Sequence, residues 1–168
     1  MDAATLTSTT LATPVGALAL VVDDTGALVA AGFCPIADLE RRLRATSRPV
    51  AELGAVGRAV AAYLVGDLTA VDSLAVHQPG TQHQQAVWKA LRDVVPGTTV
   101  SYGQLTARLG LVPGASRAVG SACGANLVAP VVPCHRVVRG DGALGGYYYG
   151  LAVKRWLLEH EAGGALAV

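Results

Sequence analysis

The chain has 168 residues, of which 52% are hydrophobic and 5% aromatic, so it can bury a core and is not a low-complexity, disordered chain. Its formal net charge of +1 hides an asymmetry, because residues 1–78 hold five basic and eight acidic residues while residues 79–168 hold eight basic and four acidic ones. A basic second half is compatible with an anionic partner for that half.

The cysteines and the apolar stretches limit the class of protein. Cys34, Cys123 and Cys134 are odd in number and widely spaced, which argues against a disulfide framework and fits a reducing compartment. No CxxC or HxxxH pattern occurs, so we expect no zinc site. The N-terminus lacks the features of a signal peptide, and no apolar stretch is long enough to span a bilayer. We therefore expect a protein of a reducing, cytoplasmic compartment without a metal site or a membrane span. We also expect it to be monomeric and to need no cofactor.

The first part of the chain has the pattern of a β-hairpin followed by helices. Apolar runs at 18–22 and 27–33, separated by the turn Asp23–Gly26, predict two antiparallel strands. Helical spacing of apolar residues predicts helices over 37–45 and 53–65, and a further strand is expected over 68–76. Proline and glycine at His77–Gly80 then indicate a domain boundary, with one domain over 1–78 and another over 79–168.

Two capping-box signatures follow this boundary, because Thr81–Gln84 and Ser101–Gln104 each open an expected helix. A turn with glycine and proline leads to a third helix over 115–125, which completes the outline of a helix-turn-helix. The third helix contains two glycines and many small side chains, so another surface can approach its backbone closely. That surface is either a neighbouring helix or a DNA groove, into which Arg117 is the one long side chain able to reach.

The stretch Pro133–Val137 places a cysteine and a histidine side by side. It follows an apolar run over 127–132, expected to be a buried strand, and precedes a glycine-rich loop over 140–150 and a last helix over 151–161. The predicted fold class is therefore α+β. A small N-terminal antiparallel-sheet domain with helices precedes a mostly helical C-terminal domain with a helix-turn-helix and a short active-site strand.

The Cys134–His135 pair has two interpretations. Cys134 is either a small buried apolar residue or a nucleophile, which must become a thiolate before it can attack. His135 is a candidate base, but neighbours on a strand point to opposite faces. The two can cooperate only if the strand ends at Pro133 or if a water bridges them. Glu161 is the candidate acceptor that would orient His135.

Pro133-Cys-His-Arg-Val137 resembles the active-site motif of the O6-alkylguanine-DNA alkyltransferases, also called methylated-DNA–protein-cysteine methyltransferases. The resemblance covers most of the chain and is strongest over 80–161. Other motifs fall in the family's order and spacing: Gly80–Gln84, Val87–Leu91, Gly97–Gly103, Arg117–Gly120, Asn126 and Lys154–Glu161. The start Thr13–Leu18 is similar to the family's first domain.

The resemblance implies direct-reversal DNA repair. An alkyl group would pass irreversibly from O6-alkylguanine, and also from O4-alkylthymine, in double-stranded DNA to Cys134. The helix-turn-helix would bind the minor groove and the damaged nucleotide would be flipped out. Residues 1–78 would be a structural domain, and residues 79–168 the DNA-binding and alkyl-acceptor domain. Each molecule would act once, because no residue offers a way to remove the group from the thioether.

The resemblance also assigns roles to single residues. The catalytic residues would be the acceptor Cys134, the base His135 acting through a water, its partner Glu161, and Tyr102, which donates a proton to the leaving guanine. Arg117 would fill the gap left by the flipped nucleotide, with DNA contacts from Ala115, Ser116, Gly120 and Ser121. Asn126 would tie the recognition helix to the active-site strand. The base pocket and its support would come from Val137, Tyr147, Tyr148, Tyr149 and Lys154.

The sequence departs from the family pattern at His83, usually phenylalanine, at Leu127, commonly proline, and at Tyr148-Tyr149, usually smaller residues. The tyrosines are either surface variation or narrow the pocket against bulky groups. Two other functions remain open: a lesion-binding or self-resistance protein of the same fold for a specialised adduct, and a Cys-His-Glu thiol hydrolase. A transcription factor that reads the major groove would need more polar reach than residues 115–125 provide.

Overall fold

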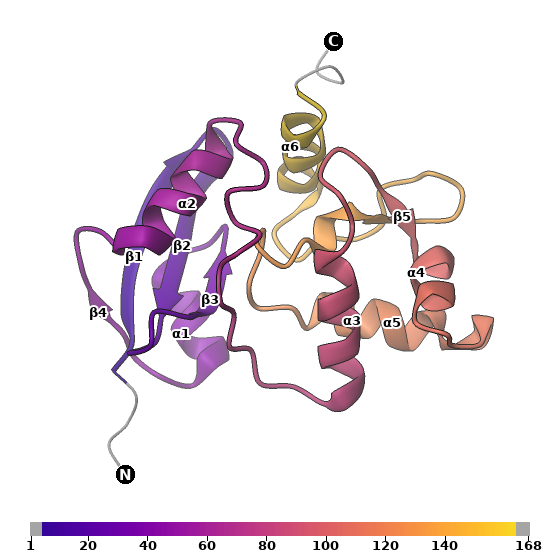
Figure 1. Cartoon of the computed structure of the whole chain (residues 1–168), viewed down its shortest axis with the longest axis horizontal. Helices are drawn as coiled ribbons and strands as arrows, with labels where there is room; N and C mark the ends of the chain where they lie inside the picture. The colour runs from indigo at the N-terminus through magenta and orange to yellow at the C-terminus, as the bar shows by residue number, and fades with distance from the viewer. Residues whose placement is uncertain (1–4, 164–168) are drawn as a thin grey trace. The chain divides into compact units, whose positions relative to one another are not determined.

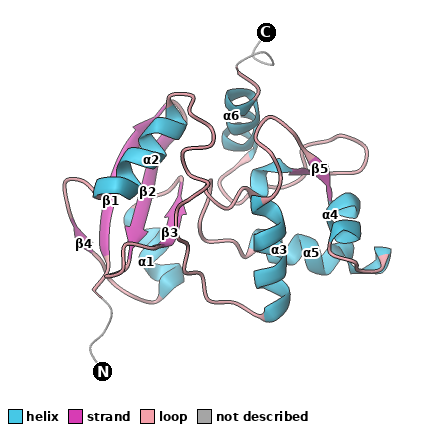
Figure 2. Cartoon of the chain, viewed as in Figure 1, coloured by secondary structure: helices cyan, strands magenta, loops and turns pink. Residues whose placement is uncertain are grey.

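The structure is a computed structural model and describes residues 5–163, which fall into two compact units. One unit contains residues 5–78 and 127–131, and the other contains 79–126 and 132–163. Figure 1 shows the course of the chain, and Figure 2 the distribution of helices and strands. No helix between residues 5 and 163 is long and apolar enough to cross a membrane. The sequence predicts a single domain boundary between residues 78 and 79. It does not predict that residues 127–131 belong to the first unit.

The first unit is built on a four-stranded sheet in the order β3-β2-β1-β4. Its strands are β1 (Thr7–Thr13), β2 (Gly16–Val22), β3 (Leu28–Gly32) and β4 (Arg48–Pro49), all antiparallel except that β4 runs parallel to β1. The predicted hairpin is confirmed as β2 and β3. The polar strand β1 was not predicted, because five of its seven residues are threonine or serine and give no apolar alternation.

The strand expected over 68–76 is wrong. Residues 68–73 form turns, and Val76 makes only an isolated bridge to Leu28. Polar residues interrupt this stretch at Thr69, Asp72 and Ser73, and short polar side chains of this kind favour turns over a ladder.

Two helices cover the two faces of this sheet. Leu39 of α1 (Ile36–Leu43) packs in one cluster with Ala19, Val21 and Ala30. Helix α2 (Gly54–Leu64) lies near Thr9 and Leu11 of β1, across the front of the sheet in Figure 1. Thr9 and Leu11 pair with Leu20 and Leu18, whose side chains point away from those of Ala19 and Val21. This two-sided cover explains why Leu18–Val22 is buried throughout.

The second unit is mostly helical, and the α+β class is confirmed. It contains α3 (Gln82–Arg92), α4 (Tyr102–Arg108), α5 (Ser116–Gly124) and α6 (Leu151–Glu161), with short 3-10 turns at Pro113–Ala115 and Cys134–Arg136. The two-residue strands β5 (Val100–Ser101) and β6 (Val137–Val138) pair in parallel. Both predicted capping boxes are confirmed: the side chains of Thr81 and Ser101 accept from the N–H groups of Gln84 and Gln104 at 3.1 and 3.0 Å.

The buried strand expected over 127–132 is also wrong. Val128 makes one isolated bridge to Ala31, and no regular strand forms there. Pro130 lacks an N–H and cannot continue a ladder. The segment instead bonds to β3, because Ala31 donates to the Leu127 carbonyl at 2.9 Å and Ala129 donates to the Ala31 carbonyl at 3.0 Å. The N–H of Leu127 donates to the Gln78 side chain at 2.5 Å, a bond that proline at this position could not make.

Helix α3 holds the small-residue helix α5. The indole Nε1 of buried Trp88 donates to the Ala122 carbonyl at 2.8 Å, and His83 Nε2 lies 3.2 Å from the Ala118 carbonyl. Residues 118 and 122 are four apart and therefore share one face of α5. His83 thus has a structural contact that phenylalanine, the usual family residue at this position, could not make.

Trp88→Phe is expected to lower the free energy of unfolding by about 1–3 kcal/mol, because it removes a buried hydrogen bond and leaves a small void. Urea denaturation measures this change. Trp156→Phe is the matched control: Trp156 is half-buried and stacks on His160 at 4.8 Å, and its replacement should cost less. Equal losses from the two substitutions would contradict the role assigned to Trp88.

Candidate active site

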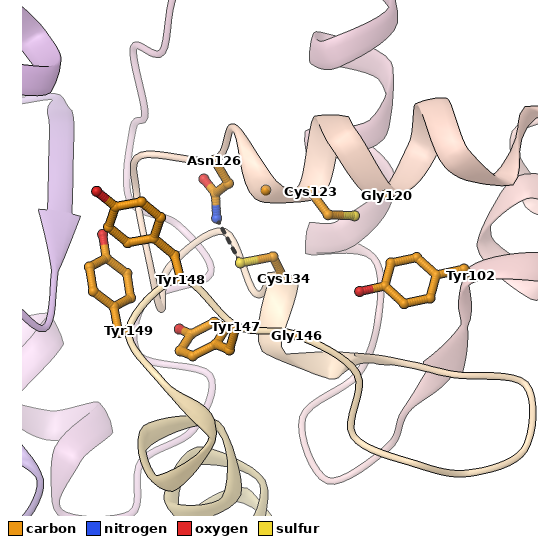
Figure 3. A pocket seen from close by; sticks show the side chains of 10 residues that line it. Tyr102, Gly120, Cys123, Asn126, Cys134, Gly146, Tyr147, Tyr148 and Tyr149 are labelled. Atoms are coloured by element: carbon orange, nitrogen blue, oxygen red, sulfur yellow. Dashed lines mark hydrogen bonds between the residues drawn. The ribbon is translucent and has the colours of Figure 1, made fainter.

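A cavity of about 240 Å³ opens in the second unit beside Cys134 (Figure 3). Four segments line it: the start of α4, one face of α5 with Asn126 two residues after its end, the 3-10 turn that carries Cys134, and the loop before α6. The lining residues are Tyr102, Gly120, Cys123, Gly124, Asn126, Cys134, Gly146, Tyr147, Tyr148 and Tyr149. Small residues on α5 and aromatic residues on the loop make this cavity a mostly apolar site with a few polar groups, which is typical of small-molecule sites.

Cys134 lies on the 3-10 turn after Pro133 and is half-buried. Asn126 Nδ2 donates to the Cys134 sulfur at 3.3 Å and to the Val132 carbonyl at 2.8 Å. The first of these bonds stabilises negative charge on sulfur, and the second fixes the amide that provides it. Asn126 therefore links the residues after α5 to the cysteine.

Next to this cysteine, His135 and Arg136 share one buried carboxylate. His135 Nε2 lies 2.5 Å from Glu161 Oε1, and Arg136 binds the same carboxylate through Nε at 2.8 Å and Nη2 at 2.9 Å. Arg136 Nη1 donates to the Val94 carbonyl at 2.6 Å. His135 Nδ1 has no hydrogen-bond partner within residues 5–163. Since Nε2–H donates to a carboxylate, Nδ1 carries the lone pair and can accept a proton.

Burial and charge set the protonation of this group. Burial lowers the pKa of His135 more strongly than Glu161 raises it, so the imidazole is neutral at pH 7. Burial alone would raise the pKa of Glu161, but hydrogen bonds and charge from His135 and Arg136 outweigh it and hold the pKa well below its ordinary value. A neutral base therefore stands beside a fixed negative charge that would stabilise its protonated form.

Tyr102 and Cys123, two other groups of the cavity, stay protonated at neutral pH. Burial raises the pKa of Tyr102, and Cys123 and Cys134 add to that shift, so the phenol is a proton donor whose oxygen points toward Cys134 (Figure 3). Burial also raises the pKa of Cys123 to about 12, which leaves it a poor nucleophile. Tyr102 lies against Gly120, where a Cβ would come within 3.7 Å of its ring.

Lys154 and the tyrosines shape the loop over the cavity. The Lys154 ammonium is fully buried and donates to the carbonyls of Val137 at 2.8 Å, Gly146 at 3.2 Å, and Leu144. Tyr149 stands edge-on to Tyr147 and Tyr148, with ring centroids 5.7 and 5.0 Å apart. Lys154 thus fixes the loop that carries three aromatic rings to the cavity wall.

Some predicted site residues lie away from the cavity. Arg117 and Ser121 are exposed on α5, and Ala115 lies in the turn before it. Ser116 Oγ lies 3.1 Å from Thr106 Oγ1 and so connects α5 to α4. Val137, whose backbone was expected at the base pocket, is not among the residues that line this cavity; its carbonyl accepts a hydrogen bond from Lys154 at 2.8 Å.

Sequence reasoning missed Cys123, Gly124, Gly146 and Arg136. Helical spacing could have found the first two, since positions 120, 123 and 124 share one face of α5. A charged residue inside the apolar stretch 131–138 could have singled out Arg136, because buried arginine is rare unless it is paired.

The comparisons with known proteins agree with this geometry. The family described as "6-O-methylguanine DNA methyltransferase, DNA binding domain" matches residues 82–163. The methylated-DNA–protein-cysteine methyltransferase of Mycobacterium tuberculosis is 47% identical over 116 residues, which cover 69% of this chain and 68% of that protein. The chain belongs to the methylated-DNA–protein-cysteine methyltransferase family. The Salmonella typhimurium relative is 48% identical over 108 residues, 64% of this chain, and the chain spans 63% of its length.

Solved structures extend the family likeness to nearly the whole chain. The crystal structure of Mycobacterium tuberculosis OGT in complex with DNA has a TM-score of 0.81 and 37% identity, covering 94% of this chain and 93% of that chain. The O6-methylguanine methyltransferase structure from the same organism gives 0.78 and 34%, with 97% and 95% covered. Both units therefore have counterparts in solved members of the family.

Glu161→Gln is expected to lower the free energy of unfolding by about 3 kcal/mol or more at pH 7, because Arg136 would keep a buried charge without its counter-ion. The folded pKa of Glu161 lies below its ordinary value of 4.5, so this stabilisation is complete above pH 4.5 and is lost as pH falls toward the depressed value. The difference between wild type and variant, measured by urea denaturation, should therefore shrink below pH 4.5.

Glu159→Gln provides the control for that series. Glu159 lies on the same helix and forms no ion pair within residues 5–163. Its replacement should change stability by about 0.5 kcal/mol or less. A Glu161→Gln variant as stable as this control would exclude a paired, charged Glu161.

Proposed function

We propose that this protein repairs alkylated DNA by direct reversal, transferring the alkyl group of O6-alkylguanine, and of O4-alkylthymine, to Cys134. The observation that carries the proposal is the half-buried Cys134 sulfur at a cavity of about 240 Å³, with a neutral histidine anchored to a buried carboxylate next to it in the chain. Family membership and a relative solved in complex with DNA support the same function.

The first step makes the nucleophile. Cys134 gives its proton through an intervening water to Nδ1 of His135, and Glu161 stabilises the imidazolium that forms. Asn126 donates to the sulfur and so favours the thiolate. A thiolate is the effective nucleophile, and a cysteine near its ordinary pKa would supply only a few per cent of it at neutral pH.

The second step transfers the alkyl group. The sulfur forms a bond to the alkyl carbon while the carbon–oxygen bond to guanine breaks, and the phenol of Tyr102 donates its proton to the departing base. The product is a thioether, which is a stable end point. Each molecule therefore acts once, and Cys134 is consumed in stoichiometric amount.

DNA binding supplies the substrate to the cavity. The alkylated atom of a stacked base is inaccessible, so the nucleotide must leave the helix at a cost of a few kcal/mol. The helix-turn-helix of α4 and α5 would lie in the minor groove, where binding needs no base code, and exposed Arg117 would fill the gap. Further DNA contacts would come from Ala115, Ser116, Gly120 and Ser121.

We further propose that the protein is a monomer and that it is located in the cytoplasm or the nucleoid.

The test uses duplex DNA with one O6-methylguanine and the intact mass of the protein. Wild-type protein should gain one methyl group, on the Cys134 peptide, without turnover. Cys134→Ser should gain nothing, whereas Cys34→Ser should behave as wild type, because Cys34 lies in the other unit. Lesion binding without mass gain would support the lesion-binding alternative, and repeated turnover the hydrolase; both would overturn the proposal.

The tyrosine-lined wall predicts discrimination by adduct size. O6-benzylguanine should react about tenfold or more slowly than O6-methylguanine, because overpacking a filled site costs about 1–3 kcal/mol. Tyr149→Ala should raise the benzyl rate more than the methyl rate in single-turnover assays. Equal rates for the two adducts in the wild type would show that the three tyrosines do not narrow the cavity.

A further inference from the structure

An open groove of about 660 Å³ lies beside the cavity and shares Tyr102 and Gly146 with it. Its other lining residues are Arg139, Ala143, Leu144, Gly145, Leu151 and Arg155. Two of these residues are basic and none is acidic, so the groove offers positive charge next to the cavity.

The local fold fixes Arg139 at this groove. Arg139 begins a tight turn after β6, in which its N–H donates to the Ala143 carbonyl at 2.9 Å and its carbonyl accepts from Gly142 at 3.0 Å. Gly145 has a φ of +72°, and a Cβ there would lie 3.3 Å from Arg139 Cγ and 3.6 Å from the Tyr102 ring. The aliphatic stem of Arg139 and the Tyr102 ring therefore both pack against the backbone of Gly145.

The two arginines are not neutralised by neighbouring acids. Both are exposed, and neither makes an ion pair within residues 5–163. Asp141 lies in the same turn as Arg139, but its Oδ1 accepts from the N–H of Ala143 at 3.0 Å. Glu159 follows Arg155 by one helical turn without an ion pair. The guanidinium groups of Arg139 and Arg155 are thus available to bind an anion.

We propose that Arg139 and Arg155 bind a backbone phosphate of the DNA strand whose nucleotide enters the adjoining cavity. The inference rests on the proposed function for the identity of the anion. Guanidinium groups bind phosphate oxygens with two parallel hydrogen bonds, and an open groove accommodates a polymer better than a small enclosed anion. Because the groove and the cavity share Tyr102, a phosphate bound there lies close to the base that the cavity holds. The contact positions the strand and carries no sequence information.

The experiment compares two substrates, duplex DNA with O6-methylguanine and the free base O6-methylguanine, which has no phosphate. In R139A/R155A, transfer to Cys134 from subsaturating duplex should fall about tenfold or more at about 0.1 M salt, the effect expected when charge-assisted hydrogen bonds are removed. Transfer from the free base should stay within about twofold. The slope of log affinity against log salt for undamaged duplex should become shallower by about 1 to 2, because each phosphate that the protein no longer neutralises changes it by about one unit.

Two control variants separate a local contact from general charge. R48A/R58A removes two exposed arginines from the other unit and should leave both rates and the salt slope as in wild type. R139K/R155K keeps the charge and should retain most of the salt slope while losing part of the duplex rate, since lysine cannot bind bidentately. Thermal unfolding confirms that each variant folds.

Each other outcome has a definite meaning. Wild-type duplex rates and slope in R139A/R155A would overturn the inference and leave the proposed function intact. An equal loss for duplex and free base would also overturn it, because the arginines would then support the cavity itself. If wild-type protein alkylates Cys134 from neither substrate, the proposed function fails. The salt slope on undamaged duplex then still decides whether these arginines bind phosphate.

Discussion

The geometry around Cys134 depends on one buried carboxylate. Glu161 accepts hydrogen bonds from His135 and twice from Arg136, and Arg136 also reaches the carbonyl of Val94. These contacts connect the 3-10 turn, α6 and the residue that follows α3 by two positions. Buried charge is favourable only when it is paired and hydrogen-bonded, and here each charged group is satisfied. The same pairing fixes the tautomer of His135 and leaves Nδ1 with its lone pair.

The small residues of α5 serve two surfaces at once. One face meets α3, where the carbonyls of Ala118 and Ala122 accept from His83 and Trp88. Another face lines the cavity with Gly120, Cys123 and Gly124. The sequence left open whether these residues pack against a helix or against DNA. These residues do pack against a helix, and exposed positions of α5 such as Arg117 remain available for contact with DNA.

Local signals in the sequence were sufficient for much of the fold. Both capping boxes and the helices they open, the β2–β3 hairpin and helix α6 follow from patterns within a few residues. The errors had two causes. Strand β1 has no apolar alternation, although it pairs along its length with the adjacent β2, and 127–132 is apolar but makes long-range bonds to β3 instead of forming a strand. At the site, the family resemblance pointed to Glu161, Tyr102 and Asn126. It missed Arg136, whose partner lies 25 residues away, and Arg139, whose position depends on the turn that follows it.

The segment 127–131 has a consequence for the modularity of this protein. It stands five residues long between Asn126 and Val132, both of which frame Cys134, yet its hydrogen bonds go to β3 and to Gln78. A fragment inherited or excised as residues 79–163 would carry this apolar segment without the strand that binds it. The boundary that the sequence suggests near residue 78 is therefore not a clean division of the fold, because the first unit also includes a segment from beyond it.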